Sequence, residues 1–103
     1  MNYDLDEVKE QLEDGDAQLF DVREQDEWDA GHLSQASLVT LSGLSSGALP
    51  DGVDKSKPTY LHCRSGQRVY RAAPLLESLG FENVIPLNEG FEALLAEGFQ
   101  VEV

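Results

Sequence analysis

The sequence has few residues that form disulfides, bind metals or carry positive charge. Its 103 residues include one cysteine, two histidines and seven lysines or arginines, against 20 aspartates or glutamates. A single cysteine excludes an intramolecular disulfide, and Cys63 with His32 and His62 cannot supply the four ligands of a structural zinc site. We expect no bound metal, and nothing in the sequence indicates a cofactor. A lone free thiol also points to a reducing compartment, the cytoplasm.

Long apolar runs and a cationic leader are missing as well. The longest stretch without a charged side chain, residues 30–50, is interrupted by polar residues and glycines and cannot span a bilayer. The first residues, Met1–Glu7, lack the cationic and apolar segments of a signal peptide. A formal charge of -13 repels nucleic-acid phosphates and anionic lipids, because binding to either depends on lysine and arginine. We therefore expect a cytoplasmic protein with no nucleic-acid or membrane partner.

Five of the seven cations lie in one acid-free stretch, residues 55–76, which also contains the only cysteine. They are Lys55, Lys57, Arg64, Arg68 and Arg71. This stretch carries a charge of +5 and the remainder carries -18, which together give the total of -13. The clustering is either a chance shortage of acids or the mark of a thiol that handles an anion, and we favour the second interpretation.

The length and the residue pattern favour one α/β domain over residues 1–103. A chain of this size buries enough surface to fold without cross-links, and helix and strand patterns alternate along it. The expected helices are 5–14, 25–30, 69–79 and 91–97, and the expected strands are 18–22, 37–41, 59–62 and 83–87. Residues 42–57 are expected to be mostly loop with one helical turn near Leu44. Pro74 lies inside an expected helix and should bend it.

The residues that carry chemistry lie between an expected strand and an expected helix, where α/β sheets place their ligand sites. A loop that enters a helix turns backbone N–H groups inward, and these stabilise a thiolate or a bound anion. Arg64 and Arg68 add positive charge, Ser65 adds a hydroxyl, and Gly66 permits a tight turn. Thiols in such surroundings have pKa values of roughly 3.5–7.5 instead of about 8.5. Cys63 is therefore a candidate nucleophile, the alternative being a buried structural cysteine.

Neighbouring polar residues receive supporting roles. Asp21 and Arg23 are expected to brace the loop from a neighbouring strand end, and His32 to be a hydrogen-bonded turn residue. His62 should point to the opposite side of the strand from Cys63, which argues against a Cys–His nucleophile–base pair.

Three segments, in this order, resemble the rhodanese-like sulfurtransferases. Asp21 to Ala36 contains Asp-Val-Arg, Glu-Trp and Gly-His-Leu and is similar to the strand–helix–loop signature of the family. Cys63–Arg68 is similar to its active-site loop, and Leu79–Gly90 to its closing segment. The resemblance covers nearly the whole chain and implies a small central parallel sheet flanked by helices on both sides.

The resemblance also implies a reaction. Cys63 would take the outer sulfur of thiosulfate as a persulfide and release sulfite, and a thiol or cyanide acceptor would then remove that sulfur. The implied substrate-binding residues are Arg64, Ser65, Gly66, Gln67 and Arg68, whose backbone N–H groups would hold the persulfide. By the pattern of the family, the two arginines favour thiosulfate over a keto-acid donor.

Other functions share this fold. Phosphatases and arsenate reductases have one more residue between cysteine and arginine, whereas Cys63 and Arg68 enclose four, and the shorter loop suits a single sulfur atom better. A non-catalytic binding module of this fold lacks the cysteine. Sulfur relay to a protein partner stays open as an alternative. The sulfurtransferase hypothesis predicts a solvent-accessible sulfur with the loop N–H groups turned toward it.

Overall fold

A four-stranded parallel sheet forms the centre of the computed structural model, which describes residues 3–103. In spatial order its strands are β3 (Ala36–Leu38), β1 (Gln18–Asp21), β4 (Thr59–His62) and β5 (Val84–Pro86). Every neighbouring pair is parallel, so the carboxyl ends of the strands meet at one edge of the sheet. The small central parallel sheet that the resemblance implied is confirmed.

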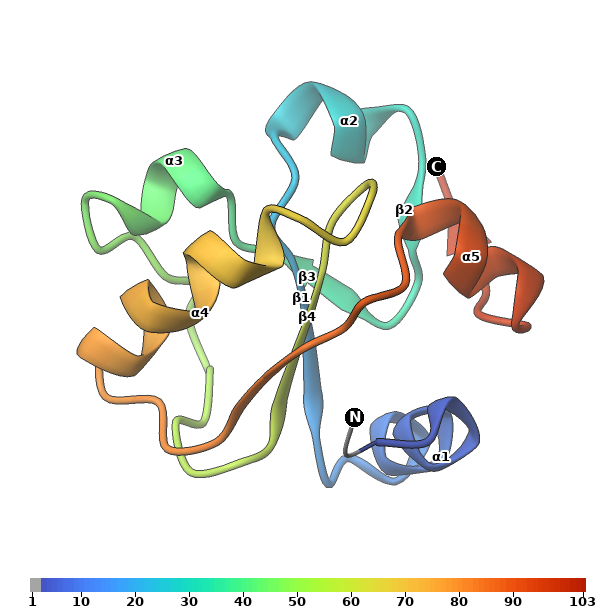
Figure 1. The fold of residues 1–103 in the computed structure, drawn as a ribbon, viewed down its shortest axis with the longest axis horizontal. Coiled ribbons are helices and arrows are strands. Elements are labelled where there is room, and N and C mark those ends of the chain that lie inside the picture. The colour runs from blue at the N-terminus through green and yellow to red at the C-terminus, as the bar shows by residue number, and fades with distance from the viewer. Residues whose placement is uncertain (1–2) are drawn as a thin grey trace.

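Helices cover both faces of this sheet (Figure 1). They are α1 (Leu5–Asp14), α2 (Gln25–Asp29), α3 (Leu41–Leu44), α4 (Val69–Ser78) and α5 (Phe91–Ala96). Figure 1 shows α3 and α4 on one face, α1 and α5 on the other, and α2 beyond the carboxyl ends of β1 and β4. The α/β architecture is as expected. Half of the predicted element boundaries match the structure, and all but one of the others differ by a single residue.

Two apolar clusters, one on each face, hold the helices against the sheet. Leu19 and Tyr60 belong to the cluster under α1 and α5, whereas their neighbours Phe20 and Leu61 belong to the cluster under α3 and α4. This alternation follows from the two-residue period of a strand. All four side chains are buried, because a parallel sheet covered by helices has no solvated face.

Local signals start and stop α1. The side chain of Asp4 accepts a hydrogen bond from the N–H of Asp6 at 2.9 Å, which satisfies one of the unpaired donors of the first turn. Gly15 ends the helix in a left-handed conformation, with φ of 77°.

The second predicted strand was wrong in its bounds. We expected 37–41, but β3 spans Ala36–Leu38 and a short helix, α3, begins at Leu41. The cause is Thr40, whose hydroxyl accepts a hydrogen bond from the N–H of Gly43 at 3.0 Å and so turns the chain into a helix.

A second, antiparallel sheet was not predicted at all. It pairs β2 (His32–Leu33) with β6 (Val101–Glu102), and strands of two residues are too short to show an alternating pattern. Helix α4 runs on through Pro74, as expected, and the bend there stays a prediction. Within residues 3–103, no helix combines the length and the apolar character that crossing a membrane requires.

Candidate active site

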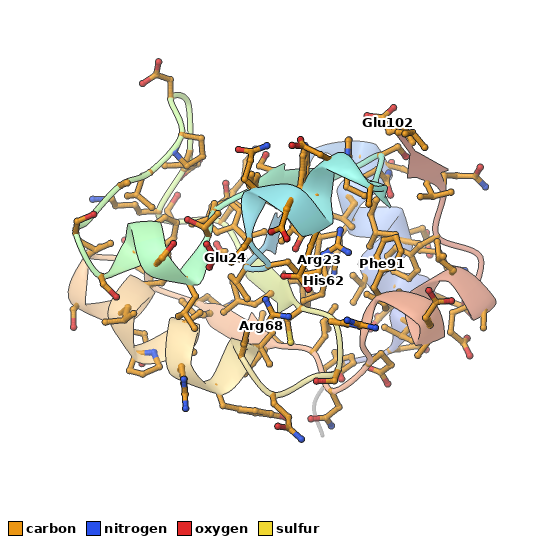
Figure 2. The ribbon with its side chains drawn as sticks, turned by 90° about the horizontal axis from the view of Figure 1, so that it is seen from above. Arg23, Glu24, His62, Arg68, Phe91 and Glu102 are labelled. Atoms are coloured by element: carbon orange, nitrogen blue, oxygen red, sulfur yellow. The ribbon has the colours of Figure 1, made fainter. Side chains whose placement is uncertain are left out.

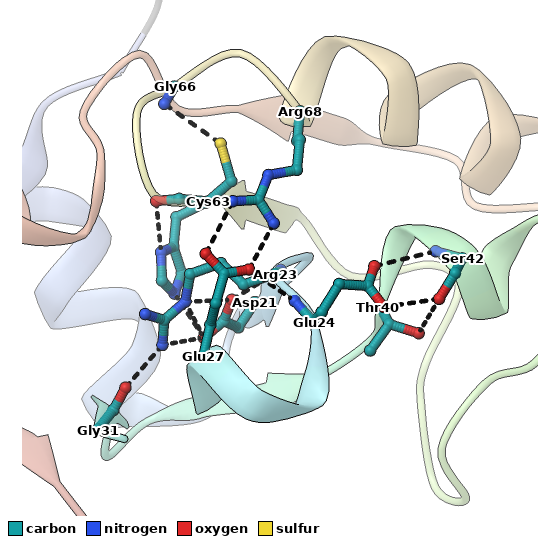
Figure 3. A network of polar contacts seen from close by, with 11 residues as sticks. Asp21, Arg23, Glu24, Glu27, Gly31, Thr40, Ser42, Cys63, Gly66 and Arg68 are labelled. Atoms are coloured by element: carbon teal, nitrogen blue, oxygen red, sulfur yellow. Dashed lines mark hydrogen bonds and ion pairs between the residues drawn. The ribbon is translucent and has the colours of Figure 1, made fainter. Parts of the chain in front are cut away.

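Cys63 directly follows β4 and opens the loop that leads into α4 (Figure 3). The backbone N–H of Gly66 donates to the Cys63 sulfur at 3.2 Å. Gly66 has a φ of 79°, a left-handed conformation that turns its N–H back toward the sulfur. Among the hydrogen bonds of residues 3–103, this is the one that reaches the sulfur. The structure thus brings one loop amide to Cys63 rather than the several that the sequence predicted.

The sulfur is also more deeply buried than the sulfurtransferase hypothesis predicted. Cys63 is 0% exposed and belongs to the apolar cluster of the α3 and α4 face, together with Val22 and Val69. Arg64, Ser65 and Gln67 lie on the surface around it. The expectation of an accessible sulfur is therefore wrong for this conformation, because the loop folds over its own cysteine. With the loop in this position, the sulfur has no exposed surface that a donor can contact.

A second segment, residues 88–91, forms the wall behind the loop. The N–H of Phe91 donates to the carbonyl oxygen of Arg64 at 3.2 Å. Gly66 and Gly90 allow the two backbones to touch: a β-carbon on Gly66 would collide with the carbonyl of Asn88, and one on Gly90 with the carbonyl of Arg64. Both contacts need a glycine because no side-chain atom fits between the backbones.

Tyr3 anchors this wall. Its hydroxyl donates to the Glu89 carboxylate at 2.6 Å and accepts from the N–H of Asn88 at 2.8 Å. Burial, together with the hydrogen bond to Glu89, raises the pKa of Tyr3 to about 12, so the phenol keeps its proton. No pattern in the residues around Tyr3 predicts this contact, because its partners lie more than 80 residues away in the sequence.

The two loop arginines differ in their partners. Arg68 donates to both oxygens of Glu27, at 2.6 and 2.9 Å, and this fork compensates its charge (Figure 3). Arg64 is exposed and forms no ion pair with any of residues 3–103. We predicted that both arginines attract the donor. The structure shows that Arg68 fixes the loop to α2, and attraction of a donor by either arginine stays a prediction.

A cleft of about 300 Å³ lies beside the loop. Its lining includes Arg64, Phe91 and Glu92, together with Arg23 and Glu27. A larger cleft of about 580 Å³ runs along β5, but no residue of 63–68 lines it. We therefore assign the smaller cleft to the candidate site. No three metal-binding side chains among residues 3–103 are placed to share an ion.

A buried ion pair lies next to this cleft. Arg23 donates to both carboxylate oxygens of Asp21, at 2.8 to 3.0 Å, and to the carbonyl oxygen of Gly31 at 2.7 Å. The Phe91 ring packs against the Arg23 guanidinium, whose central carbon lies 4.3 Å from the centroid of the ring. The hydrogen bonds of Arg23 tie the end of β1 to the chain after α2. Within residues 3–103 no hydrogen bond or ion pair joins Asp21 or Arg23 to residues 63–68, so the expected bracing of the loop stays a prediction.

The prediction for His32 holds only in part. His32 stacks on Trp28 with ring centroids 3.6 Å apart, and its Nδ1 lies 3.0 Å from the carbonyl oxygen of Trp28, but the residue begins strand β2 and does not lie in a turn. His62 stacks against Phe91 of α5, whereas Cys63 packs on the α4 side. Within residues 3–103, no hydrogen bond joins His62 to the Cys63 sulfur, which agrees with the prediction.

Replacing Glu27 by glutamine should loosen the loop from α2. The hydrogen bond from Arg68 lowers the pKa of Glu27 from 4.5 to about 2. A lowered pKa stabilises the folded state above pH 4.5, and that stability is lost as the pH falls toward 2. We expect Glu27→Gln to lower the unfolding free energy by about 1 kcal/mol at pH 7, since the pair is partly exposed. The variant should also lose less stability than the wild type between pH 4.5 and pH 2.

Urea unfolding at pH 7 and pH 3 measures both effects. The matched control is Glu13→Gln, which removes an exposed carboxylate from α1. Equal pH dependence in Glu27→Gln and the wild type would show that the pair adds no stability.

The site combines a cysteine after a central parallel strand, a tight glycine turn onto its sulfur and a helix that begins at the end of the loop. This is the arrangement of a cysteine-dependent transferase on an α/β fold. The chain belongs to the rhodanese-like domain family, whose model matches residues 4–97.

Relatives and solved structures agree with this assignment. The chain is 30% identical over 86 residues to the thiosulfate sulfurtransferase GlpE of Coxiella burnetii, covering 84% of this chain and 78% of that protein. It is 37% identical over 76 residues to YqhL of Bacillus subtilis, covering 74% of this chain. A crystal structure of the Anabaena Alr3790 protein matches with a TM-score of 0.80 at 29% identity, covering 97% of this chain and 79% of that one. The human single-domain sulfurtransferase TSTD1 matches with a TM-score of 0.77 at 26% identity, covering 90% and 93%.

Some relatives are longer than the region they share with this chain. The matched region spans 59% of YqhL and 19% of the probable adenylyltransferase/sulfurtransferase MoeZ of Mycobacterium tuberculosis, to which the chain is 31% identical over 75 residues.

Proposed function

We propose that this chain transfers sulfane sulfur from thiosulfate to a thiophilic acceptor, cyanide or a thiol, through a persulfide on Cys63. The observation that carries the proposal is the Cys63 sulfur at the end of β4, with the N–H of Gly66 donating to it. The membership in the rhodanese-like family and the similarity to a thiosulfate sulfurtransferase support the same reaction.

The chemistry takes place in two displacements. The Cys63 thiolate attacks the outer sulfur of thiosulfate, a new S–S bond forms, and the old S–S bond breaks as sulfite leaves with the electron pair. An acceptor thiolate or cyanide then attacks the outer persulfide sulfur, and Cys63 leaves as thiolate. The N–H of Gly66 stabilises negative charge on the sulfur throughout.

Intact-mass spectrometry tests the proposal. Protein exposed to thiosulfate should gain about 32 Da, the mass of one sulfur atom, and should lose it on treatment with cyanide or a reducing agent. Absence of this increment would contradict the proposal. If the chain instead hydrolysed a phosphate ester through Cys63, the phosphatase alternative would replace it.

Replacing Arg64 by alanine should weaken donor binding more than turnover. Arg64 is the exposed loop arginine without an ion pair among residues 3–103, and it lines the cleft beside the loop. Losing one screened charge costs about 1 kcal/mol, so we expect KM for thiosulfate to rise about fivefold while kcat changes little. The KM of the variant should also depend less on salt than that of the wild type.

Steady-state kinetics at two salt concentrations measure this effect. The matched control is Arg71→Ala on the exposed side of α4, which removes the same charge away from the cleft. Equal KM increases in both variants would show that only the total charge of the chain matters.

A protein acceptor is a second candidate. The MoeZ relative carries sulfurtransferase in its name, and the charge of -13 suits a basic partner. When the persulfide-loaded chain is mixed with a basic acceptor protein and no small-molecule thiol is present, the acceptor protein should gain about 32 Da, the mass of one sulfur atom.

A further inference from the structure

His62 is a buried imidazole whose polar surroundings are incomplete. Its side chain is 0% exposed. Among the buried side-chain nitrogens and oxygens of residues 3–103, Nε2 of His62 is the one without a hydrogen-bond partner. Nε2 lies 3.6 Å from Oδ2 of Asp21, and Nδ1 lies 3.4 Å from the carbonyl oxygen of Cys63. Both neighbouring atoms are acceptors.

This geometry suits the protonated ring better than the neutral one. A neutral imidazole has one N–H, so one of its nitrogens presents a lone pair to an oxygen. The imidazolium has two N–H groups and donates toward both the Asp21 carboxylate and the Cys63 carbonyl. An unpartnered buried atom of this kind calls for an explanation, because nearly all buried polar atoms are paired.

The charges around the site supply the explanation. Arg23 is paired with Asp21, and Arg68 is paired with Glu27. Arg68 is also close enough to Cys63 for a negative sulfur to raise the pKa of its guanidinium. A thiolate at Cys63 adds one negative charge at a position that is 0% exposed, with one N–H donating to it. An uncompensated charge in such a place is unfavourable.

His62 is the group that can restore the balance. It faces Asp21 of β1, Arg23 just after β1, the carbonyl of Cys63, and the uncharged Phe91 ring of α5 (Figure 2). Burial lowers the pKa of His62 and Asp21 opposes that effect. A negative charge on the neighbouring residue makes the ring easier to protonate.

We propose that His62 is the counter-ion of the Cys63 thiolate, binding a proton at Nε2 when the cysteine loses its own. The S–H bond breaks, an N–H bond forms, no electrons are transferred, and the total charge of the buried cluster stays constant. The proton does not pass directly between the two side chains, because sulfur and imidazole lie on opposite sides of β4. A persulfide anion has the same charge as the thiolate, so His62 stays protonated while sulfur is bound.

The inference rests on the proposed role of Cys63 as nucleophile. His62 is a positioning residue in this scheme and not a catalytic one, since it contacts the carbonyl of Cys63 and not its sulfur.

Nitrogen-15 NMR of the imidazole groups in the full chain tests the inference without any sulfur donor. The comparison is made at the pH where the thiolate absorbance, at about 240 nm, appears. At that pH the imidazolium fraction of His62 should be at least about tenfold higher in the wild type than in Cys63→Ala. His32 is the internal control and should titrate alike in both proteins. Equal His62 titrations, or no thiolate at any pH at which the protein is folded, would overturn the inference.

A second variant tests the reciprocal effect. His62→Gln keeps an N–H donor but carries no charge, and its thiolate fraction at neutral pH should fall at least about tenfold. A purely structural His62 would lower stability and leave the thiolate fraction unchanged. If His62→Gln fails to fold, the comparison of the wild type with Cys63→Ala still decides. A missing mass increment with the NMR result intact would reject the proposed function alone, and the converse would reject this inference alone.

Discussion

Replacing Cys63 by serine is expected to lower sulfur transfer by at least about 1,000-fold. A serine hydroxyl is not ionised at neutral pH and forms no persulfide, and the chain has no second cysteine to take over. The variant should fold, because the hydroxyl is slightly smaller than the thiol and can still accept the hydrogen bond from Gly66. We expect its unfolding free energy to change by only about 1 kcal/mol.

Thiocyanate formation from thiosulfate and cyanide measures the loss, and circular dichroism checks the fold. Full transfer by a folded Cys63→Ser would remove Cys63 from the mechanism altogether. Partial transfer in proportion to contaminating wild-type protein would leave the mechanism intact. Mass spectrometry of the sample shows whether wild-type protein is present.

Replacing Gly66 by alanine should be the most damaging change that leaves every charged group in place. The new β-carbon would collide with the carbonyl of Asn88, and the backbone would keep a φ of 79° that alanine tolerates poorly. The loop and the wall must separate, and the N–H of Gly66 then leaves the sulfur. We expect a loss of at least about 3 kcal/mol in unfolding free energy, or a loop that no longer closes and a loss of transfer.

Two further glycines give matched controls for this variant. Gly52 has a φ of 80°, but a β-carbon there meets no atom within 4 Å, so Gly52→Ala should cost only about 1 kcal/mol and spare transfer. Gly90 has a φ of -81°, so Gly90→Ala tests the collision with the Arg64 carbonyl without the backbone strain. If Gly66→Ala and Gly52→Ala behaved alike in thermal melts and kinetics, close contact with the wall would have no role.

Local features of the chain predicted much of the fold. The cap at Asp4 and the left-handed Gly15 fix α1 from neighbouring residues alone, and the strand before Cys63 and the helix after it place the loop at the edge of the sheet. The hypothesis that Cys63 is a nucleophile also depends only on residues that lie next to it in the sequence. Such features need no knowledge of the rest of the molecule.

Contacts between distant segments were not predictable in this way. The pairing of Arg68 with Glu27 joins residues 41 positions apart, and nothing near either one shows that the other compensates its charge. The burial of the sulfur depends on how the loop packs against residues 88–91, which a local pattern does not encode. The charge requirement at His62 likewise appears only when β1, β4 and α5 are seen together.

The hydroxyl of Tyr3 connects the beginning of the chain mechanically to the reactive loop. It holds Glu89 and the backbone of Asn88, and Asn88 in turn touches Gly66. Loss of the Tyr3 hydroxyl removes both hydrogen bonds from the segment that lies against Gly66. The reactivity of the thiol toward an alkylating reagent then reports on whether this distant phenol still holds residues 88–89 in place.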